Sequence, residues 1–169
     1  MEKKDIKKVV IGVGLQGPNL CQPREMRYTP QIAVDGRYSI PFSLANALVH
    51  GWVTLANFTD EGLHDPEVLA MCEKIEWYQD EELVRETKGV DFSKITIELN
   101  DGRSFYQKVT DPLGSPTNPV TDDDIVAKFR DCCSHARKPI SEENVNKLVD
   151  MCLHLEDVED IRDLIALCC

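Results

Sequence analysis

Arg37 is the residue of this chain best suited to bind an anion. It stands two residues before Ser39, where an apolar-periodic stretch predicts the start of a helix. A guanidinium in this place can hold a carboxylate with two hydrogen bonds, beside backbone amides of the first helical turn that lack partners within the helix. A solvated or salt-bridged surface arginine is the simpler interpretation of the same residue. Arg24, Arg27 and Tyr28 could line the cleft in which Arg37 would bind an anion, although their spacing does not require it.

Other residues that often do chemistry lack the arrangement that the chemistry needs. The sequence has no Ser-His-Asp order, phosphate-binding loop or metal motif, so it nominates no catalytic residue. The seven cysteines form no CxxC pair and are odd in number, so we expect reduced thiols. Two cysteine–histidine groupings invite a metal interpretation, but helical spacing does not place their members on one face, and we expect no metal. They are Cys132 and Cys133 with His135, and Cys152 with His154. We expect solvent or structural roles for all four histidines, which are His50, His64, His135 and His154.

The elements around Arg37 can be predicted from caps and periodicity. Ser39 is a plausible N-cap, Pro41 is tolerated in the first turn, and Gly51 can close the last turn in the left-handed conformation. A half-buried helix of about three turns is therefore expected. Its apolar face recurs at three- and four-residue steps: Ile40, Leu44, Ala45, Leu48 and Val49.

Strands are predicted on both sides of this helix. Residues 6–13 alternate and indicate an opening strand, and 75–79 could form another. Residues 95–99 alternate before Asp101-Gly102, which predicts a type I′ hairpin into 103–109. The hairpin and the opening strand should form one sheet, because each has an apolar face that helices must cover.

Further helices should start at Asp65, Thr121, Ser141 and Asp157, each followed by an apolar stripe. The remaining segments predict irregular structure: 14–31 as an extended connection, 54–64 as a loop, 78–86 as a loop or short helix, and 111–119 as a Pro- and Gly-rich turn region. Together these elements predict an α+β fold, a two-layer sandwich with an antiparallel-rich sheet covered by helices and a helical C-terminal segment. We expect a single domain over 1–169.

Composition narrows the function classes. The 169 residues are 42% hydrophobic and 29% charged, which is typical of a globular domain. A net charge of −11 argues against binding nucleic acid, and it would not steer an anionic substrate to the chain. No apolar run is long enough for a membrane span, and the N-terminus has no signal-peptide pattern, so we expect no membrane association and a cytoplasmic location.

Six segments in order resemble the C-terminal lid domain of the MmgE/PrpD family. They are IKKVVIGVG (6–14), PREMRYTPQ (23–31), RYSIPFSLANALVHG (37–51), FTDEGLHDPEVLAMCEKIEW (58–77), ITIELNDGRSFYQKV (95–109) and GSPTNPVTDDDIVAKF (114–129). This family includes 2-methylcitrate dehydratase, cis-aconitate decarboxylase and iminodisuccinate epimerase, which act at carbon next to a carboxylate. The resemblance covers nearly the whole chain but only about the last third of a family member. It implies that most of the catalytic groups lie in a helical domain, either on another chain or in a missing part of this one.

The resemblance also implies a site and partners. Arg37, Ser39 and Phe42 are the candidate substrate-binding residues, and Phe42 replaces a tyrosine that reaches the substrate in decarboxylase-like members. Because phenylalanine has no hydroxyl to donate, the substrate geometry could differ here. The implied function is the lid of a lyase or isomerase for a small di- or tricarboxylic acid, without a cofactor and inactive without the helical domain. The resemblance also suggests a homodimer. The alternative is a noncatalytic module that binds a small acid or a protein.

Overall fold

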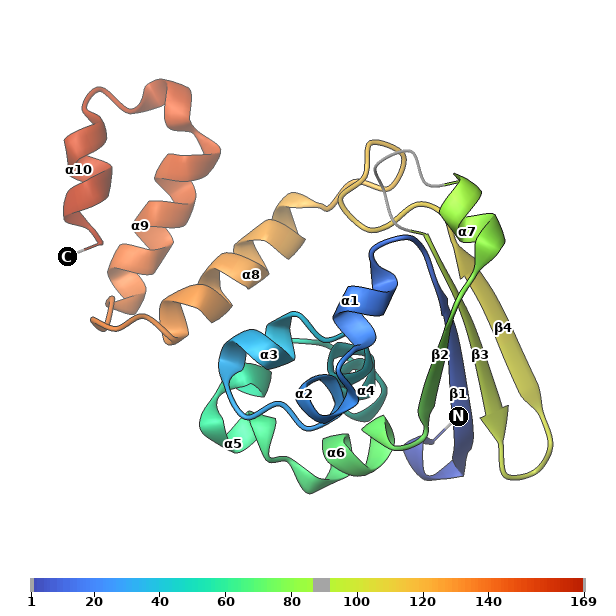
Figure 1. Cartoon of the computed structure of the whole chain (residues 1–169). Helices are drawn as coiled ribbons and strands as arrows, with labels where there is room; N and C mark the ends of the chain where they lie inside the picture. The colour runs from blue at the N-terminus through green and yellow to red at the C-terminus, as the bar shows by residue number, and fades with distance from the viewer. Residues whose placement is uncertain (1, 87–91, 169) are drawn as a thin grey trace. The chain divides into compact units, whose positions relative to one another are not determined.

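The computed structural model describes residues 2–86 and 92–168. Its contacts divide the chain into two compact units, residues 1–118 and 119–169. The first unit holds a four-stranded sheet with helices, and the second is helical (Figure 1). This arrangement confirms the predicted α+β class. The expectation of a single domain over 1–169 stays a prediction.

The sheet of the first unit contains the predicted opening strand and hairpin together. Its order is β2-β1-β3-β4, with β1 parallel to β2 and antiparallel to β3, and β3 antiparallel to β4. The strands are β1 (Ile6–Val13), β2 (Ile75–Gln79), β3 (Ser93–Leu99) and β4 (Ser104–Val109). The antiparallel-rich sheet is therefore confirmed. Its parallel pair is β1 with β2, two strands that helices α1 to α6 connect along the chain.

One face of the sheet is apolar and lies against the helices. Val9 pairs with Ile75 on one side and with Ile97 on the other, so these side chains form a row across the sheet. Val9 and Ile75 are fully buried, and Ile97 packs on the same core. Figure 1 shows helices α1 to α6 on this side of the sheet. The core therefore lies between the sheet and a single helical layer, as a two-layer fold requires.

Helix α4 (Ile40–His50) is the predicted helix after Arg37, and both of its caps are confirmed. The Ser39 Oγ accepts a hydrogen bond from the Phe42 N–H at 3.0 Å. Gly51 ends the helix with φ of 82°, a conformation that side chains with a Cβ rarely adopt. Of the predicted stripe, Ala45 is fully buried and the other four residues are half-buried against the core. Phe42, which was not part of that stripe, is fully buried as well. The apolar face is therefore rotated toward Phe42.

Helix α6 (Pro66–Cys72) is capped by Asp65, as predicted. The Asp65 Oδ1 accepts hydrogen bonds from the N–H groups of Glu67 and Val68, at 2.8 and 3.4 Å. Val68 and Cys72 are fully buried. This helix packs beside α4 in the helical layer.

Two segments that were predicted to be irregular contain short helices. Residues 14–31 form α1 (Gly17–Cys21) and α2 (Arg24–Tyr28), and 54–64 form the 3-10 helix η2 (Leu55–Phe58) and α5 (Asp60–Leu63). Helix α3 (Ala33–Arg37) was not predicted either, and a 3-10 turn η1 (Lys3–Asp5) precedes β1. In 14–31 the expectation failed because two prolines stand at helix starts, where their missing N–H costs nothing: Pro18 is the second residue of α1, and Pro23 is the N-cap of α2.

The β3–β4 hairpin forms as predicted, but its turn type was wrong. A type I′ turn needs positive φ at both central residues, and only Gly102 has one, at 87°. The Gly102 N–H donates to the Leu99 carbonyl at 3.1 Å, and the Leu99 N–H donates to the Arg103 carbonyl at 2.8 Å. The connection is therefore the three-residue kind, with a turn over Asn100 and Asp101 followed by a left-handed glycine.

An ion network fastens α7 (Glu81–Glu86) to the hairpin. The Lys94 ammonium lies 2.9 Å from Asp80 and 2.6 Å from Glu82, and Lys108 lies 2.9 Å from both Glu82 and Glu86. Asp80 also accepts a hydrogen bond from the Leu83 N–H at 3.0 Å. Hydrogen bonds from Lys94 lower the pKa of Asp80 to about 2, and those from Lys94 and Lys108 lower the pKa of Glu82 to about 2. The pKa of Lys94 is raised in turn.

We expect this network to make the stability of the first unit depend on pH in the acidic range. Because the folded carboxylates keep a pKa of about 2 against ordinary values near 4, their contribution is complete above about pH 5 and is lost as the pH falls toward 2. Lys94→Met should lower the denaturant midpoint at neutral pH and flatten its fall between pH 5 and 2. Lys7→Met, which changes an exposed lysine of β1, is the matched control. Equal pH profiles for the two variants would contradict the assignment.

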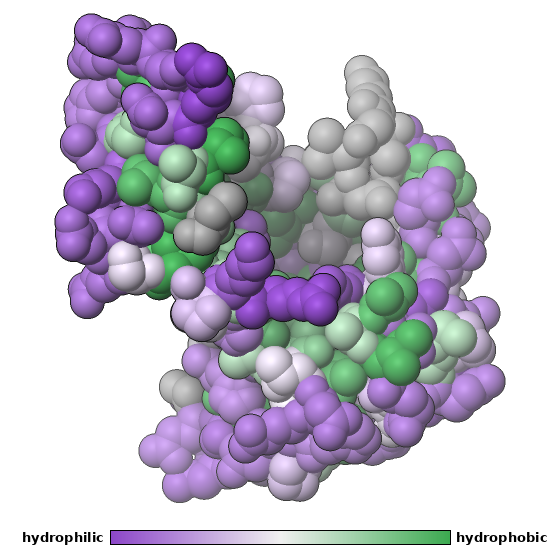
Figure 2. All heavy atoms as spheres, turned by 90° about the vertical axis from the view of Figure 1, so that its left-hand side faces the viewer, coloured by the Kyte–Doolittle hydropathy of each residue, from purple (hydrophilic) through white to green (hydrophobic). Residues whose placement is uncertain are grey.

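The second unit contains α8 (Asp122–Ser134), α9 (Glu142–Leu153), the 3-10 turn η3 (Leu155–Asp157) and α10 (Ile161–Ala166). The caps Thr121 and Ser141 are confirmed, but the last helix is capped by Asp160 and not by Asp157. The stripe predicted on α8 is at most half-buried, and the buried apolar residues among those described in this unit are Val145 and Leu148 of α9. In the upper part of Figure 2, hydrophobic atoms of this unit lie among hydrophilic ones. Its exposed apolar side chains include Leu153, Leu155, Ile161 and Ile165.

Among the helices of the described residues, none combines the length and the apolar composition that a membrane crossing requires.

Candidate functional site

Ser39 acts as a cap and is not accessible in this chain. Its side chain is 2% exposed. The Oγ accepts from the Phe42 N–H and donates to the Arg27 carbonyl at 2.5 Å, so both hydrogen-bonding directions are used within the protein. Ser39 therefore fixes the start of α4 and has no free group to offer a ligand.

Phe42 lies in the core of the first unit. Its ring is 0% exposed and packs against Phe58 of η2, with ring centroids 6.3 Å apart and planes tilted by 52°. Gly36 is also close, since a Cβ there would lie 3.4 Å from the Phe42 ring. Phe42 therefore connects α4, α3 and η2 by packing.

Arg37 is exposed at the end of α3, immediately before the cap of α4. Its guanidinium carbon lies 5.9 Å from the centroid of the Phe58 ring, which is within the range of a cation–π contact. No hydrogen bond or ion pair that the described residues form engages this guanidinium. Arg37 is thus held in place through its contact with an aromatic ring while its donors remain available.

The other predicted cleft residues are already engaged. Arg24 pairs with Glu73 at 2.8 Å and lies 3.9 Å above the Tyr28 ring. Arg27 donates to the backbone carbonyls of Gln22 and Asp35, at 3.2 and 3.4 Å. Tyr28 is buried, and its hydroxyl donates to the Ile75 carbonyl. Burial raises the pKa of this phenol. Among these basic residues, Arg37 has the donors that a bound acid could use.

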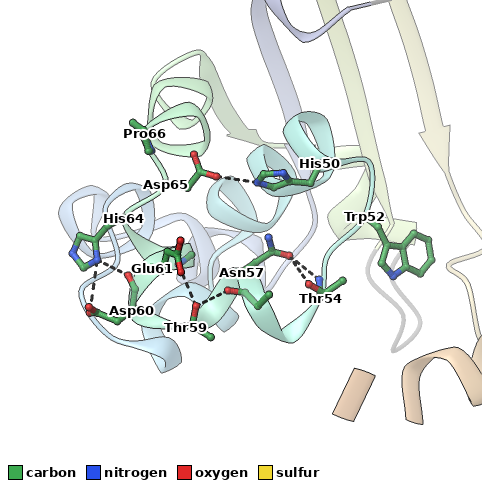
Figure 3. A pocket seen from close by; sticks show the side chains of 12 residues that line it. His50, Trp52, Thr54, Asn57, Thr59, Asp60, Glu61, His64, Asp65 and Pro66 are labelled. Carbon is green, nitrogen blue, oxygen red and sulfur yellow. Dashed lines mark hydrogen bonds and ion pairs between the residues drawn. The ribbon is translucent and has the colours of Figure 1, made fainter. Parts of the chain in front are cut away.

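A cavity of about 900 Å³ opens near the other end of α4 (Figure 3). At its rim, the His50 Nε2 lies 3.1 Å from the Asp65 Oδ2 and joins the end of α4 to the cap of α6. The Nδ1 of His64 lies 2.7 Å from the Asp60 carbonyl. Figure 3 shows Trp52 at one side of the cavity and His64 at the other. The lining residues are His50, Trp52, Thr54, Ala56, Asn57, Thr59, Asp60, Glu61, Gly62, His64, Asp65 and Pro66.

The chemistry of this cavity differs from that of the predicted site. Asp60, Glu61 and Asp65 give it carboxylates, which accept hydrogen bonds and repel an anionic ligand. Ser39 and His50 lie at opposite ends of α4, about 16 Å apart at 1.5 Å per residue. Arg37, which precedes Ser39, and His50 therefore stand at opposite ends of this helix. A di- or tricarboxylic acid is better matched by Arg37 than by the cavity.

The sequence did not indicate that His50 and Asp65 meet. Their roles as the last residue of α4 and the cap of α6 were visible, but their contact depends on how η2 and α5 fold between them. The thiols give no further site. Burial raises the pKa of Cys21 and of Cys72 to about 12, which makes both poor nucleophiles. Within the described residues, no three histidine, cysteine or acidic side chains gather as metal ligands would.

Comparisons with known proteins connect this fold to one family. A sequence model of the MmgE/PrpD C-terminal domain matches residues 2–155. The chain is 30% identical over 140 residues to cis-aconitate decarboxylase of Aspergillus terreus, an overlap of 82% of this chain and 28% of that protein. It is 26% identical to the human cis-aconitate decarboxylase over 134 residues and 24% identical to the mouse enzyme over 131 residues.

Each match covers most of this chain but a small part of the relative. The chain spans 26 to 28% of the length of these curated relatives, while they cover 78 to 82% of the chain. Because the family model extends over most of the sequence, the chain belongs to the MmgE/PrpD family, of which it contains the C-terminal domain.

Proposed function

We propose that this chain is the lid of a lyase or isomerase that acts on a small di- or tricarboxylic acid. The observation that carries the proposal is the family match over residues 2–155, together with relatives that are named cis-aconitate decarboxylase. In the proposed enzyme, a region outside this chain supplies the acid and base, and the lid excludes water and orients the substrate. The reaction is a decarboxylation, a dehydration of the 2-methylcitrate type or an epimerisation, in the cytoplasm and without a cofactor.

Arg37 is the proposed contact between the lid and a substrate carboxylate. Its guanidinium is exposed and has unused donors, and it precedes the first turn of α4. Ser39 and Phe42 position Arg37 indirectly. Ser39 fixes the helix start, and Phe42 packs against the Phe58 ring that Arg37 contacts. The sequence suggested a substrate-binding role for all three residues. We assign the substrate contact to Arg37 and positioning roles to Ser39 and Phe42.

The exposed apolar side chains support a missing partner region. In the first unit, Ile32, Val34 and Tyr38 flank Arg37 and are 58, 56 and 62% exposed. In the second unit, α10 exposes Ile161 and Ile165. Surfaces of this kind mark interaction sites on soluble proteins. We propose that the helical region, which accounts for most of the length of the relatives, covers them.

Arg37→Ala tests the proposed contact in a protein that joins this chain to the helical region of a relative. A hydrogen bond between charged groups contributes about 1.5 to 3 kcal/mol, so the substitution should weaken acid binding about tenfold to a hundredfold at an unchanged melting temperature. Isothermal titration with cis-aconitate measures this. Arg103→Ala, which removes the same charge from the hairpin turn, should bind normally. Equal affinity of the Arg37 and Arg103 variants would place the acid elsewhere.

A second candidate function is a noncatalytic module that binds a small acid or a protein. The observation that favours it is the residue at position 42, because phenylalanine lacks the hydroxyl that decarboxylase-like relatives are expected to present there, and its ring is buried in the core. In that case the chain would bind its ligand without the helical region, and no combination with that region would turn over an acid.

A further inference from the structure

Strand β4 is the outermost strand on one side of the sheet (Figure 1). It pairs with β3, where Ile97 faces Phe105 and Thr96 faces Tyr106. None of the other strands in the described ranges, 2–86 and 92–168, pairs with its second edge. This edge lies away from Arg37 and from the His50 cavity, so it belongs to neither site described above.

The hydrogen bonds of the hairpin identify the backbone groups that face outward. In an antiparallel pair, residues alternate between bonding to the neighbouring strand and pointing away from it. The Leu99 N–H donates to the Arg103 carbonyl. Every second residue after Arg103 therefore also directs its backbone N–H and carbonyl to β3; these residues are Phe105, Gln107 and Val109. The residues between them direct both backbone groups to the open edge; they are Ser104, Tyr106 and Lys108. Accordingly, the Lys108 carbonyl accepts a hydrogen bond from the Gln107 side chain at 3.3 Å instead of from β3.

This edge lacks the features that usually prevent strands from pairing between molecules. Such edges are commonly protected by proline, a bulge or a free charge. Residues 104–109 contain no proline, and their register with β3 is regular. The one charged side chain, Lys108, is held by Glu82 and Glu86 of the same molecule. Phe105 and Tyr106 are 47 and 62% exposed, on opposite faces of the strand.

We propose that the open edge of β4 pairs with β4 of a second copy of this chain. The pairing is antiparallel and centred on Tyr106, so that a two-fold axis passes beside this residue and the two sheets become one. In a continuous sheet, directly opposed residues point to the same face, which allows only registers in which the two residue numbers have an even sum. Among these, centring on Tyr106 uses all the outward groups, because Ser104 faces Lys108 of the second copy and Tyr106 faces itself.

The chemistry of the strand favours a second copy as the occupant. An isologous contact requires a surface that complements itself, and the three outward residues satisfy this condition in the register centred on Tyr106. No like charges face each other, since each Lys108 is opposite Ser104. The two Tyr106 rings lie side by side on the outer face, where aromatic cross-strand pairs stabilise sheets. Because one strand pair buries little surface, the dimer should dissociate on dilution.

Sedimentation equilibrium over a concentration series tests the proposal on the full chain. We expect the wild type to shift from monomer to dimer as its concentration rises. Tyr106→Lys opposes two like charges at the axis, and Tyr106→Pro removes an N–H that faces outward and makes no bond to β3. Each should raise the dimer dissociation constant by about tenfold or more. Gln79→Lys, on β2 at the other edge of the sheet, should leave it unchanged. A wild type that stays monomeric, or a dimer insensitive to both Tyr106 variants, overturns the proposal.

Single cysteines test the register, in a background where the cysteines after residue 130 are replaced by serine. Opposed bonded residues of antiparallel strands have Cα atoms about 5.5 Å apart, which a disulfide can span. Tyr106→Cys should therefore crosslink under oxidised glutathione. Ser104→Cys alone should not, because its symmetry mate lies about 13 Å away along the strand. The double variant Ser104→Cys, Lys108→Cys should crosslink. Efficient crosslinking of Ser104→Cys alone would refute the register, and circular dichroism of each variant verifies that it is folded.

Discussion

Phe42→Ala should lower the free energy of unfolding by about 3 to 5 kcal/mol, the usual effect of truncating a fully buried phenylalanine. The ring is 0% exposed and packs between α4, η2 and the Gly36 backbone, so its removal leaves a cavity that these elements cannot readily fill. Urea denaturation of the chain, followed by circular dichroism, measures the change. Ile40→Ala is a suitable comparison, because Ile40 is half-buried on the same helix and should have a smaller effect.

Phe42→Tyr separates packing from substrate contact at the same position. The added hydroxyl would enter a dry core, and burying it without a partner should destabilise the fold by about 1 to 3 kcal/mol. In the protein joined to the helical region, this substitution should not improve acid binding. An unchanged stability together with tighter binding of a tricarboxylic acid would show that Phe42 borders the substrate in the assembled protein.

Local signals in the sequence were sufficient for the helix ends and the hairpin. Ser39 and Asp65 cap the helices that follow them because a side-chain oxygen next to free amides is stable with little dependence on distant residues. The alternation in 95–99 likewise identified β3, since the core face of a strand must be apolar. The parallel pairing of β1 with β2 had no such local signal, because Val9 and Ile75 are separated in the sequence by all the helices of the layer.

The errors occurred where proline and glycine were treated as signs of irregular structure. In 14–31 two prolines stand at the starts of very short helices that tertiary packing stabilises, such as α2, whose Tyr28 donates to the Ile75 carbonyl of β2. In 54–64 Gly62 lies inside the short helix α5. The same limit applied to the site. Arg37 could be singled out by type and position, but its contact with Phe58 and the meeting of His50 with Asp65 both depend on how η2 folds back.

The chain by itself should be catalytically silent toward cis-aconitate and 2-methylcitrate. Loss of one general acid or base usually slows a reaction by about a hundredfold to ten-thousandfold, and none of the three candidate residues, Arg37, Ser39 and Phe42, is a usual general acid or base. The histidines that could transfer a proton, His50 and His64, line the cavity of about 900 Å³, and His50 stands at the end of α4 opposite to Ser39. Binding without turnover is therefore what the lid can offer unaided.

Turnover of cis-aconitate, followed as carbon dioxide release, tests the central claim most directly. The assay compares this chain, the helical region of an Aspergillus terreus-type cis-aconitate decarboxylase, and the two joined in one polypeptide. We predict that each part alone is inactive, that the joined protein is active, and that Arg37→Ala reduces its activity at low substrate concentration. Turnover by the chain alone that a point mutation within it abolishes would contradict the account.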